Sequence, residues 1–290
     1  MSKHASFMLI WISLAAISAF SQTVISPNEE ITTQARTLVQ AAQELEKKDK
    51  FSEAAEKYAE AVKLVPDNAA LYTYLGYAYA RLEKYDEALA ALEKAVSLDK
   101  NLVVCYYNLS IIYEKKNRPI EAISALHKAI KLNPQYINAW IRLCDLALIY
   151  DKNQEALDCY QDLVKLVPQD VNSLANYGVA LNKSKKYREA IKILQEIVAK
   201  FPNHAEAYNS LGVSFLETKK FSEAISSFNT ALKIKPEMEL TRYNLAVAQL
   251  ALHNRSAAYE QYYVLKTGSS GLAEKLIQLI QKDLLVVINK

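Results

Sequence analysis

The chain has few glycines, prolines and cysteines: 5 Gly, 7 Pro and 3 Cys in 290 residues. The scarcity of glycine and proline argues against a β-rich or loop-rich protein, because the turns that join short strands depend on these residues. Three cysteines cannot all pair within one chain, so a disulfide framework does not hold the fold together. We expect free buried thiols at Cys105, Cys144 and Cys159, with a Cys144–Cys159 bridge in an oxidising compartment as the alternative.

An excess of one charge is also absent, since 35 Lys and Arg residues and 32 Asp and Glu residues are mixed along the chain. A nucleic-acid-binding protein usually gathers its basic residues in one patch or arm, so we expect no nucleic-acid partner. Beyond the first residues, the histidines are His127, His204 and His253, none at metal-ligand spacing from a cysteine or another histidine. The sequence therefore indicates neither a metal site nor a cofactor.

One apolar run, of about fifteen residues, follows Lys3 and His4 at the N-terminus and is too short to cross a membrane comfortably. Ala19 and Ser21 then provide small residues at the spacing of a signal-peptidase site. We expect residues 1–21 to be a cleaved secretory signal and the mature protein to be exported, either periplasmic or secreted. The alternative is an uncleaved N-terminal anchor, and only then do we expect the protein to associate with a membrane.

Prolines recur at a fixed interval and reveal an internal repeat. Five of them fall on one 34-residue grid, and Lys100 takes the missing position. These prolines are Pro66, Pro134, Pro168, Pro202 and Pro236. Starting at Ala35, the grid divides the chain without gaps into seven units, numbered here as repeats one to seven, each with columns 1 to 34. The repeats are 35–68, 69–102, 103–136, 137–170, 171–204, 205–238 and 239–272.

Two columns of the grid hold only small residues, which indicates two closely packed helices in each repeat. Column 8 holds Ala42, Gly76, Ser110, Cys144, Gly178, Gly212 and Ala246, and column 20 holds alanine in every repeat. Column 24 holds large side chains instead: Tyr58, Leu92, Leu126, Tyr160, Leu194, Phe228 and Tyr262. Large side chains beside small ones give interlocking layers, and a polar turn separates a first helix, helix A, from a second, helix B.

These columns closely resemble those of the tetratricopeptide repeat (TPR) family. The resemblance rests on alanine in column 20, proline in column 32, the pairs Leu75-Gly76 and Leu211-Gly212, and bulky residues in column 4. The column-4 residues are Tyr72, Tyr106, Trp140 and Tyr208. The resemblance implies an all-α fold, a right-handed α-solenoid (TPR superhelix) of seven helix-turn-helix repeats. We expect residues 22–34 to be a linker or an extension of the first helix, and residues 273–290 to be a capping helix.

The resemblance also implies that helix A of each repeat lines a concave groove, with columns 2, 5, 6, 9, 12 and 13 facing into it. Column 6 holds Gln40, Tyr74, Asn108, Arg142, Asn176, Ser210 and Asn244. An asparagine side chain both donates and accepts hydrogen bonds, so these asparagines resemble the ladders with which some TPR domains hold extended peptides. Arg142 adds a cation that grips an acidic group, although the lysines of a complete carboxylate clamp are absent. The alternative is that the column-6 residues are ordinary solvent-facing side chains.

The same columns carry large side chains in repeats two and three, namely Tyr74, Tyr77, Tyr107 and Ile111. Contiguous exposed apolar surface usually marks a partner site, and tyrosine is favoured there because it is large, stiff and amphipathic. We therefore expect these four side chains to be exposed and to contact a bound peptide. The alternative is that neighbouring repeats bury them.

No residues form a pattern typical of a catalytic site, because the repeat explains the glycines and the recurring acidic residues. We expect no enzyme activity and no small-molecule substrate. The sequence predicts a scaffold that binds an extended peptide or protein segment in the groove, in an envelope assembly, secretion or pilus-type complex. The alternative is a structural or self-associating protein that acts through its convex face or through the apolar end of its C-terminal helix, residues 284–288.

Overall fold

The computed structural model describes residues 29–268 and 271–288, with side chains within 33–268 and 271–282. The expected secretory signal, residues 1–21, and the first part of the expected linker lie outside these residues. Every regular element in the described part of the chain is an α-helix, and there are fifteen, α2 to α16. The predicted all-α class is therefore confirmed.

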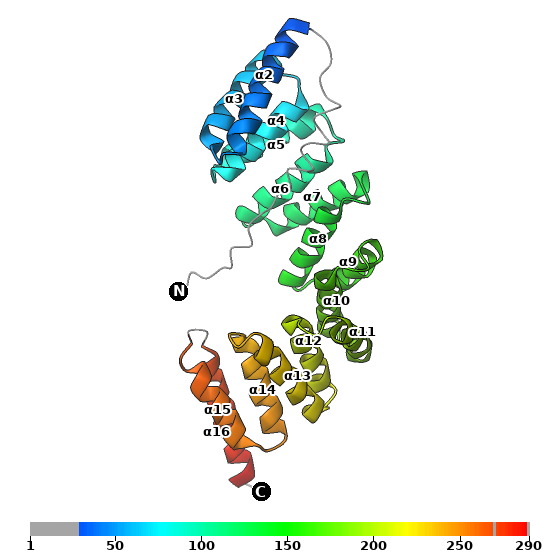
Figure 1. Cartoon of the computed structure of the whole chain (residues 1–290), viewed down its shortest axis with the longest axis vertical. Coiled ribbons are helices and arrows are strands. Elements are labelled where there is room, and N and C mark those ends of the chain that lie inside the picture. The colour runs from blue at the N-terminus through cyan, green and yellow to red at the C-terminus, as the bar shows by residue number, and fades with distance from the viewer. Residues whose placement is uncertain (1–28, 269–270, 289–290) are drawn as a thin grey trace. The chain divides into compact units, whose positions relative to one another are not determined.

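The helices alternate along the chain as the A and B helices of seven repeats (Figure 1). The A helices are α2 (Glu29–Glu46), α4 (Ala69–Arg81), α6 (Val103–Lys115), α8 (Ile137–Ile149), α10 (Val171–Lys183), α12 (Ala205–Glu217) and α14 (Glu239–Ala251). The B helices are α3 (Phe51–Leu64), α5 (Tyr85–Leu98), α7 (Pro119–Leu132), α9 (Asn153–Leu166), α11 (Tyr187–Lys200), α13 (Phe221–Ile234) and α15 (Arg255–Leu265). A last helix, α16 (Leu272–Ile288), follows the repeats.

The helix ends follow the 34-residue grid. Every A helix from repeat two onward begins at column 1, and every B helix up to α13 ends at column 30. Proline at column 32 favours this end because it has no backbone N–H to donate. α5 ends at the same column although Lys100 replaces the proline, so the turn that follows also sets the boundary. α2 begins at Glu29, before column 1, and thus extends the first A helix.

The turn between the A and B helices holds one residue in the left-handed conformation. It always occupies column 15, with φ between 53° and 61°. The residues are Asp49, Glu83, Asn117, Asp151, Lys185, Lys219 and His253. None is glycine, although left-handed backbone strains ordinary L-residues. Four of the seven are Asp, Asn or His, which adopt this conformation more readily than other residues, whereas at Glu83, Lys185 and Lys219 the packing of the two helices imposes it.

Small residues set the distance between the A and B helices, as the sequence predicts. A Cβ atom on Gly76 would lie 2.6 Å from Cγ of Leu92, and one on Gly212 would lie 2.5 Å from Cε1 of Phe228. Leu92 and Phe228 are fully buried, so a larger residue at either glycine would force the core to repack. The column-20 alanines are also fully buried in all seven repeats.

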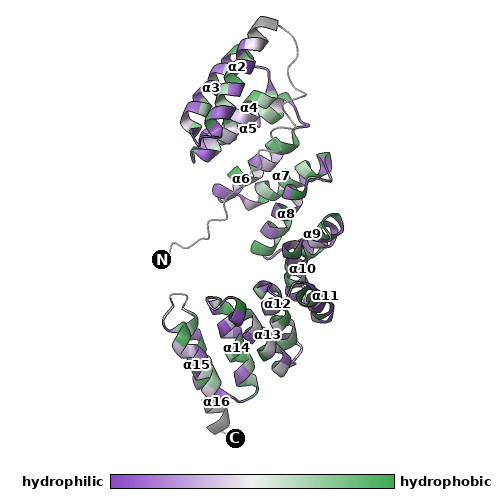
Figure 2. Ribbon diagram, viewed as in Figure 1, coloured by the Kyte–Doolittle hydropathy of each residue, from purple (hydrophilic) through white to green (hydrophobic). Residues whose placement is uncertain are grey.

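The chain forms two compact units, one that ends at Leu146 and one that begins at Ala147, within α8. In the N-terminal unit, each helix from α2 to α7 packs on the next, and α4 also contacts α6. In the C-terminal unit, each helix from α9 to α16 packs on the next, and α12 contacts both α10 and α14. Figure 2 shows that the helices carry both hydrophobic and hydrophilic residues, as expected of helices that bury part of their surface against neighbours.

α16 packs against α14 and α15 at the end of the C-terminal unit. Its Leu276 and Ile280 are fully buried in one cluster with Ala246 and Leu265. The apolar residues 284–288, predicted as an alternative contact surface, lie outside the described side chains. Among the helices that the structure describes, none combines the length and hydrophobicity needed to cross a membrane.

The cysteines differ from the expectation of three free thiols. Cys105 is free, its Sγ donates to the backbone oxygen of Leu92 at 3.3 Å, and burial raises the pKa of its thiol to about 12. Cys144 and Cys159 are both disulfide-bonded, so the expectation is wrong for these two residues. A free thiol was the first expectation because Cys144 lies in column 8, where every repeat has a small residue that packs without a covalent bond, and a disulfide was the alternative.

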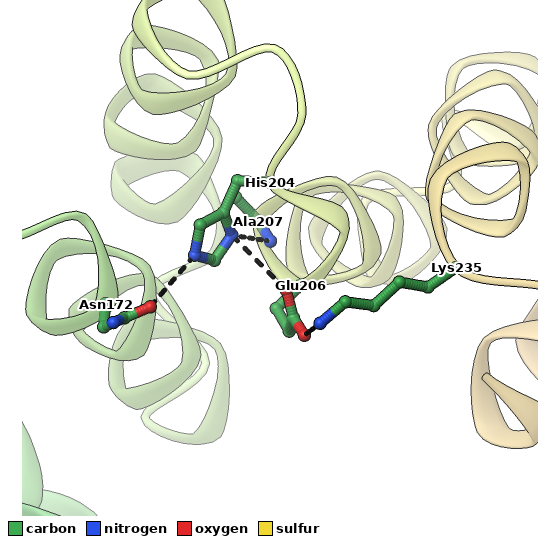
Figure 3. A network of polar contacts seen from close by, with 5 residues as sticks. All are labelled: Asn172, His204, Glu206, Ala207 and Lys235. Carbon is green, nitrogen blue, oxygen red and sulfur yellow. Dashed lines mark hydrogen bonds and ion pairs between the residues drawn. The ribbon is translucent and has the colours of Figure 1, made fainter. Parts of the chain in front are cut away.

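His204 caps α12 in the C-terminal unit (Figure 3). Its Nδ1 accepts a hydrogen bond from the backbone N–H of Ala207 at 3.1 Å, and its Nε2 lies 3.2 Å from Oδ1 of Asn172 on α10. These contacts fit a neutral ring with its proton on Nε2. Glu206 forms an ion pair with Lys235. Burial opposes ionisation of Glu206, but hydrogen bonds from Lys235 and from the backbone outweigh it and lower the pKa of this carboxyl.

Candidate functional site

The A helices carry every residue that the sequence singles out as a candidate site. We call the side chains in columns 2, 5, 6, 9, 12 and 13 of these helices the A-helix surface. Six candidates lie in the N-terminal unit: Tyr74, Tyr77, Tyr107, Asn108, Ile111 and Arg142. The other two, Asn176 and Asn244, belong to the C-terminal unit.

Tyr74 and Tyr77 on α4 pack against the first repeat. The ring of Tyr74 stacks on that of Tyr58 with centroids 5.5 Å apart, and Tyr77 meets Phe51 edge to face at 6.3 Å. Arg81 donates a hydrogen bond from Nη1 to the Tyr77 hydroxyl at 3.1 Å and lies over the Phe51 ring at 4.0 Å. Tyr77 is consequently buried, whereas Tyr74 is half-buried.

The expected exposed apolar patch is not present. Tyr77 and Tyr107 are each 8% exposed and Ile111 is 5% exposed, so the expectation of exposure is wrong for these three. Packing explains this burial, since Tyr77 meets Phe51 of repeat one edge to face at 6.3 Å, and Tyr107 meets Tyr136, at the end of its own repeat, edge to face at 5.5 Å. The alternative interpretation, burial by a neighbouring repeat, is correct for Tyr77. That these residues contact a bound peptide stays a prediction.

Asn108 on α6 is 5% exposed, and its Oδ1 atom makes no hydrogen bond with any described residue. Column 12 of the preceding A helix holds Ala80, which has no polar side-chain atom to bond to Asn108. A buried acceptor without a donor costs about 1–3 kcal/mol, so native proteins rarely retain one without a reason. Asn108 is thus placed on the A-helix surface with an unused hydrogen-bond acceptor.

Arg142 on α8 is held by Glu114 at the end of α6. Its Nη2 donates to Oε2 of Glu114 at 2.9 Å, with the two side chains 22% and 31% exposed. The Nε–H of Arg142 is buried and has no acceptor among the described residues. Burial raises the pKa of Tyr107. The charge of Arg142 acts against this shift and that of Glu114 adds to it, so the three side chains lie in one electrostatic environment. The charge of Arg142 is therefore paired, but one of its donors is unused.

The A helices of the C-terminal unit are joined by complete hydrogen bonds. Asn182 donates from Nδ2 to the backbone oxygen of Ser210 at 2.8 Å and accepts from the Ser214 hydroxyl at 2.6 Å. The Thr241 hydroxyl donates to Oδ1 of Asn209 at 2.9 Å. The candidates Asn176 and Asn244 are half-buried in this unit.

Column 12 contains functional candidates that the sequence analysis missed. It is polar in repeats one, three and five, with Glu46, Glu114 and Asn182, and apolar in the other repeats. Glu114 and Asn182 each bond to the next A helix, to column 6 in both cases. This alternation was a usable signal in the sequence.

Glu46, at the end of α2, is the member of column 12 without a polar link to the next A helix. Its Oε1 atom is buried and lacks a hydrogen bond of good geometry. Burial raises the pKa of Glu46 to about 7, although Tyr58 and Arg81 act in the opposite direction. Strongly shifted carboxyl groups are enriched at functional sites.

The polar groups of this surface include an unpaired acceptor on Asn108, an unpaired donor on Arg142 and a carboxyl group on Glu46, beside aromatic rings. Within the described residues, no group of three or more His, Cys, Asp or Glu side chains is placed to hold a metal ion.

Comparison with protein families agrees with the repeat structure. Two family models, both described as Tetratricopeptide repeat, match residues 39–101 and 178–239 in one case and residues 103–136 in the other. Together they cover more than half of the chain. The chain belongs to the tetratricopeptide repeat family. TPR proteins generally bind protein or peptide partners and are typically not enzymes.

Solved TPR structures are similar to this chain at low sequence identity. YrrB, described as a TPR protein with an unusual peptide-binding site, is 22% identical over 70% of this chain and 99% of its own, with a TM-score of 0.58. A tetratricopeptide repeat protein from Parabacteroides merdae is 16% identical over 86% and 99%, with a TM-score of 0.62. The pilF protein of Pseudomonas aeruginosa is 15% identical over 72% and 97%, with a TM-score of 0.55. A comparison with curated protein sequences gives no match.

Proposed function

We propose that this TPR protein binds an extended segment of a partner protein along the A-helix surface of its N-terminal unit, around Asn108 and Arg142. The observation that carries the proposal is the unused hydrogen-bonding capacity of these two side chains. Asn108 presents an acceptor and Arg142 a donor, on the A helices of consecutive repeats. A peptide backbone supplies the complementary groups, an N–H and a C=O for each residue.

Energetics favour an external partner for these atoms. Leaving both unpaired lowers the stability of the unit, since each buried polar group without a partner costs about 1–3 kcal/mol. A bound backbone removes this cost and excludes water at the same time. The contacts would depend on backbone groups, so the site would accept many sequences and take its specificity from neighbouring side chains.

The proposal continues the asparagine ladder expected in column 6. Asn176 and Asn244 repeat the same chemistry in the C-terminal unit, where they are half-buried. Whether the bound segment reaches them is a separate question for mutagenesis. No activity beyond binding is proposed.

We further propose that the protein acts outside the cytoplasm. The N-terminal residues have the pattern of a secretory signal, and disulfide-bonded Cys144 and Cys159 favour an oxidising compartment. A place in an envelope assembly, secretion or pilus-type complex fits export, and pilF is among the similar structures. Retention of the N-terminal segment as a membrane anchor is the alternative.

Two measurements test the export proposal. N-terminal sequencing of the protein from its native cell should begin at Gln22, whereas a start at Met1 or Ser2 would favour the anchor. Thiol titration of the unfolded, unreduced protein should give one thiol per chain, from Cys105, and three after reduction. Three thiols before reduction would contradict the disulfide.

Site-specific photo-crosslinking tests the proposed binding surface. A benzoylphenylalanine at Tyr74, half-buried on the A-helix surface, should capture one partner in the native cell. The control position is Tyr263 on α15, a B helix, where the side chain is 63% exposed. Capture of the same proteins from both positions, or from Tyr263 alone, would contradict binding along the A helices.

Affinity for the captured segment then tests the two residues. Asn108→Leu should weaken binding by about 10-fold, because it removes one buried hydrogen bond to the ligand. Asn101→Leu, an exposed asparagine before α6, is the matched control and should bind like the wild type. Equal affinity of the wild type, Asn108→Leu and Asn101→Leu would show that Asn108 does not contact the bound segment.

A further inference from the structure

The link between consecutive A helices is completed in one pair of repeats and incomplete in another. In repeats three and four, column 12 holds Glu114 and column 6 of the next repeat holds Arg142, and the two form an ion pair at 2.9 Å. In repeats one and two, the same two columns hold Glu46 and Tyr74. Repeats one and two thus have the carboxyl group, on Glu46, but have Tyr74 where repeats three and four have the guanidinium of Arg142.

The groups around Glu46 do not replace that guanidinium. Arg81 is the cation that acts on Glu46, but it is engaged elsewhere: it donates to the Tyr77 hydroxyl at 3.1 Å and lies 3.8 Å from Oδ1 of Asp49. The Tyr58 hydroxyl interacts with the carboxyl, yet neither it nor Oε1 of Glu46 makes a hydrogen bond of good geometry.

Two neighbouring buried atoms indicate an incomplete site. Oε1 of Glu46 and the hydroxyl of the fully buried Tyr58 act on each other, but neither makes a hydrogen bond of good geometry. Tyr74 stacks on Tyr58 at 5.5 Å, so an aromatic side chain of the A-helix surface lies beside this site. Burial outweighs the interactions with Tyr58 and Arg81 and raises the pKa of Glu46 to about 7.

We propose that Glu46 receives an arginine side chain of the bound partner segment, beside the rings of Tyr74 and Tyr77. This inference rests on the proposed function and specifies the chemistry of the partner. A guanidinium donates two parallel N–H groups to one carboxylate and stacks on aromatic faces, which an ammonium group does less well. The Glu114–Arg142 pair is the internal precedent, in which the chain supplies the arginine itself.

The proposal makes binding depend on pH. An arginine binds the ionised carboxyl group, so affinity should rise as Glu46 loses its proton through its pKa of about 7. The other titratable groups that act on Glu46 are Tyr58 and Arg81, and Asp49 lies beside Arg81. Burial raises the pKa of the neighbouring tyrosines, Tyr58, Tyr74 and Tyr77, so these side chains stay neutral while Glu46 ionises.

Selection from a random 12-residue peptide display library, on the full-length protein at pH 8, provides the first test. We expect arginine to be enriched at one position on the wild type and not on Glu46→Gln. The control is Glu60→Gln, an exposed carboxyl group on α3 of the same repeat, which should select the same peptides as the wild type. The thermal midpoint of each variant shows that it is folded.

A double-mutant cycle with one selected peptide provides the second test. Replacing its arginine by citrulline, a neutral side chain of the same shape, should weaken binding to the wild type by about 10-fold or more, because a charge-assisted bidentate contact is lost. The same replacement should leave the affinity for Glu46→Gln nearly unchanged. In the wild type, the advantage of arginine over citrulline should shrink as the pH is lowered from 8 to 6.

Each outcome has a distinct meaning. Peptides that bind the A-helix surface without arginine enrichment, or an equal loss with citrulline in both proteins, would overturn this inference and leave the proposed function intact. Enrichment of lysine with equal strength would overturn the choice of arginine. Failure to select any peptide that Asn108→Leu weakens would contradict the proposed function as well.

Discussion

The N-terminal and C-terminal units differ in how they use the polar groups of their A helices. In the C-terminal unit, Asn182 makes two hydrogen bonds to the next A helix, and Thr241 completes a similar link with Asn209. In the N-terminal unit, the acceptors of Glu46 and Asn108 remain unpaired on the A-helix surface. The same repeat architecture thus supports two arrangements of polar side chains. In one they hydrogen-bond to the next A helix, and in the other their acceptors have no hydrogen-bond partner.

The unpaired groups of the C-terminal unit have a different position. Asn153 lies at the start of α9, a B helix, and Gln249 lies in packing column 11 of α14. Neither belongs to the A-helix surface. Among the described residues, the buried and unpaired polar groups of the A-helix surface therefore lie in the N-terminal unit. Partner binding is proposed in the same unit.

The largest expected effect is the loss of the complete link in the C-terminal unit. Asn182→Ala removes two partly buried hydrogen bonds and should lower the free energy of unfolding by about 2–3 kcal/mol. Urea unfolding followed by circular dichroism measures this, and affinity for the partner segment should stay unchanged. An unchanged free energy of unfolding would contradict the contrast between the units, because the hydrogen bonds of Asn182 would then contribute nothing to stability.

Glu46→Gln tests the incomplete link and should act in the opposite direction. A carboxyl group with a native pKa of about 7 and an unfolded value near 4.5 keeps its proton longer in the folded state. Its contribution to stability is therefore complete at low pH and is lost as the pH rises through about 4.5 to 7. At pH 8 the substitution should stabilise the protein by about 2 kcal/mol, with little effect at pH 4.

Thermal unfolding of both proteins across this pH range gives the difference directly. Glu114→Gln serves as the contrast, since it removes a paired carboxylate and leaves Arg142 without its partner. It should destabilise the protein at pH 8. Destabilisation by both substitutions at that pH would show that Glu46 is as well satisfied as Glu114.

Asn108→Leu should raise stability by about 1 kcal/mol, because it removes a buried acceptor that has no donor. The change is nearly isosteric, so packing on α6 should be preserved. Differential scanning fluorimetry with Asn101→Leu as the control measures the shift. A marked loss of stability would indicate that Asn108 is satisfied within the unit.

Thr241→Val should have an effect as small as that of Asn108→Leu, with the opposite sign. It removes one partly buried hydrogen bond to Asn209 while keeping the side-chain shape, and should cost about 0.5–1.5 kcal/mol. Chemical denaturation resolves a change of this size. A gain in stability would mean that the polar links of the C-terminal unit are not optimised, and the contrast between the units would weaken.

The sequence predicted the fold in detail because the fold depends on side-chain size. In repeats two, five and six, a glycine in column 8 faces a large residue in column 24 at distances that exclude a Cβ atom, and column 8 is small in the other repeats as well. Residues such as Gly76 and Gly212 therefore carry the signal of the helix pair. The 34-residue period then fixes where each A helix begins.

The candidate site was less predictable, because exposure depends on neighbours. Tyr77 and Tyr107 belong to the A-helix surface by sequence, but their rings pack edge to face against Phe51 and Tyr136. These contacts are visible only in the three-dimensional structure. The alternating polarity of column 12, which includes Glu46, was visible in the sequence. Its meaning required the observation that Glu114 has an arginine partner and Glu46 has none.

The central claim is that the A-helix surface of the N-terminal unit retains unpaired polar groups for a partner. Calorimetric titration of the captured segment into wild type and Asn108→Leu, with unfolding measured on the same samples, tests it most directly. The account predicts a more stable variant that binds about 10-fold more weakly, as expected when function is maintained at a cost in stability. Unchanged affinity, or weaker binding that accompanies a loss of stability, would contradict it.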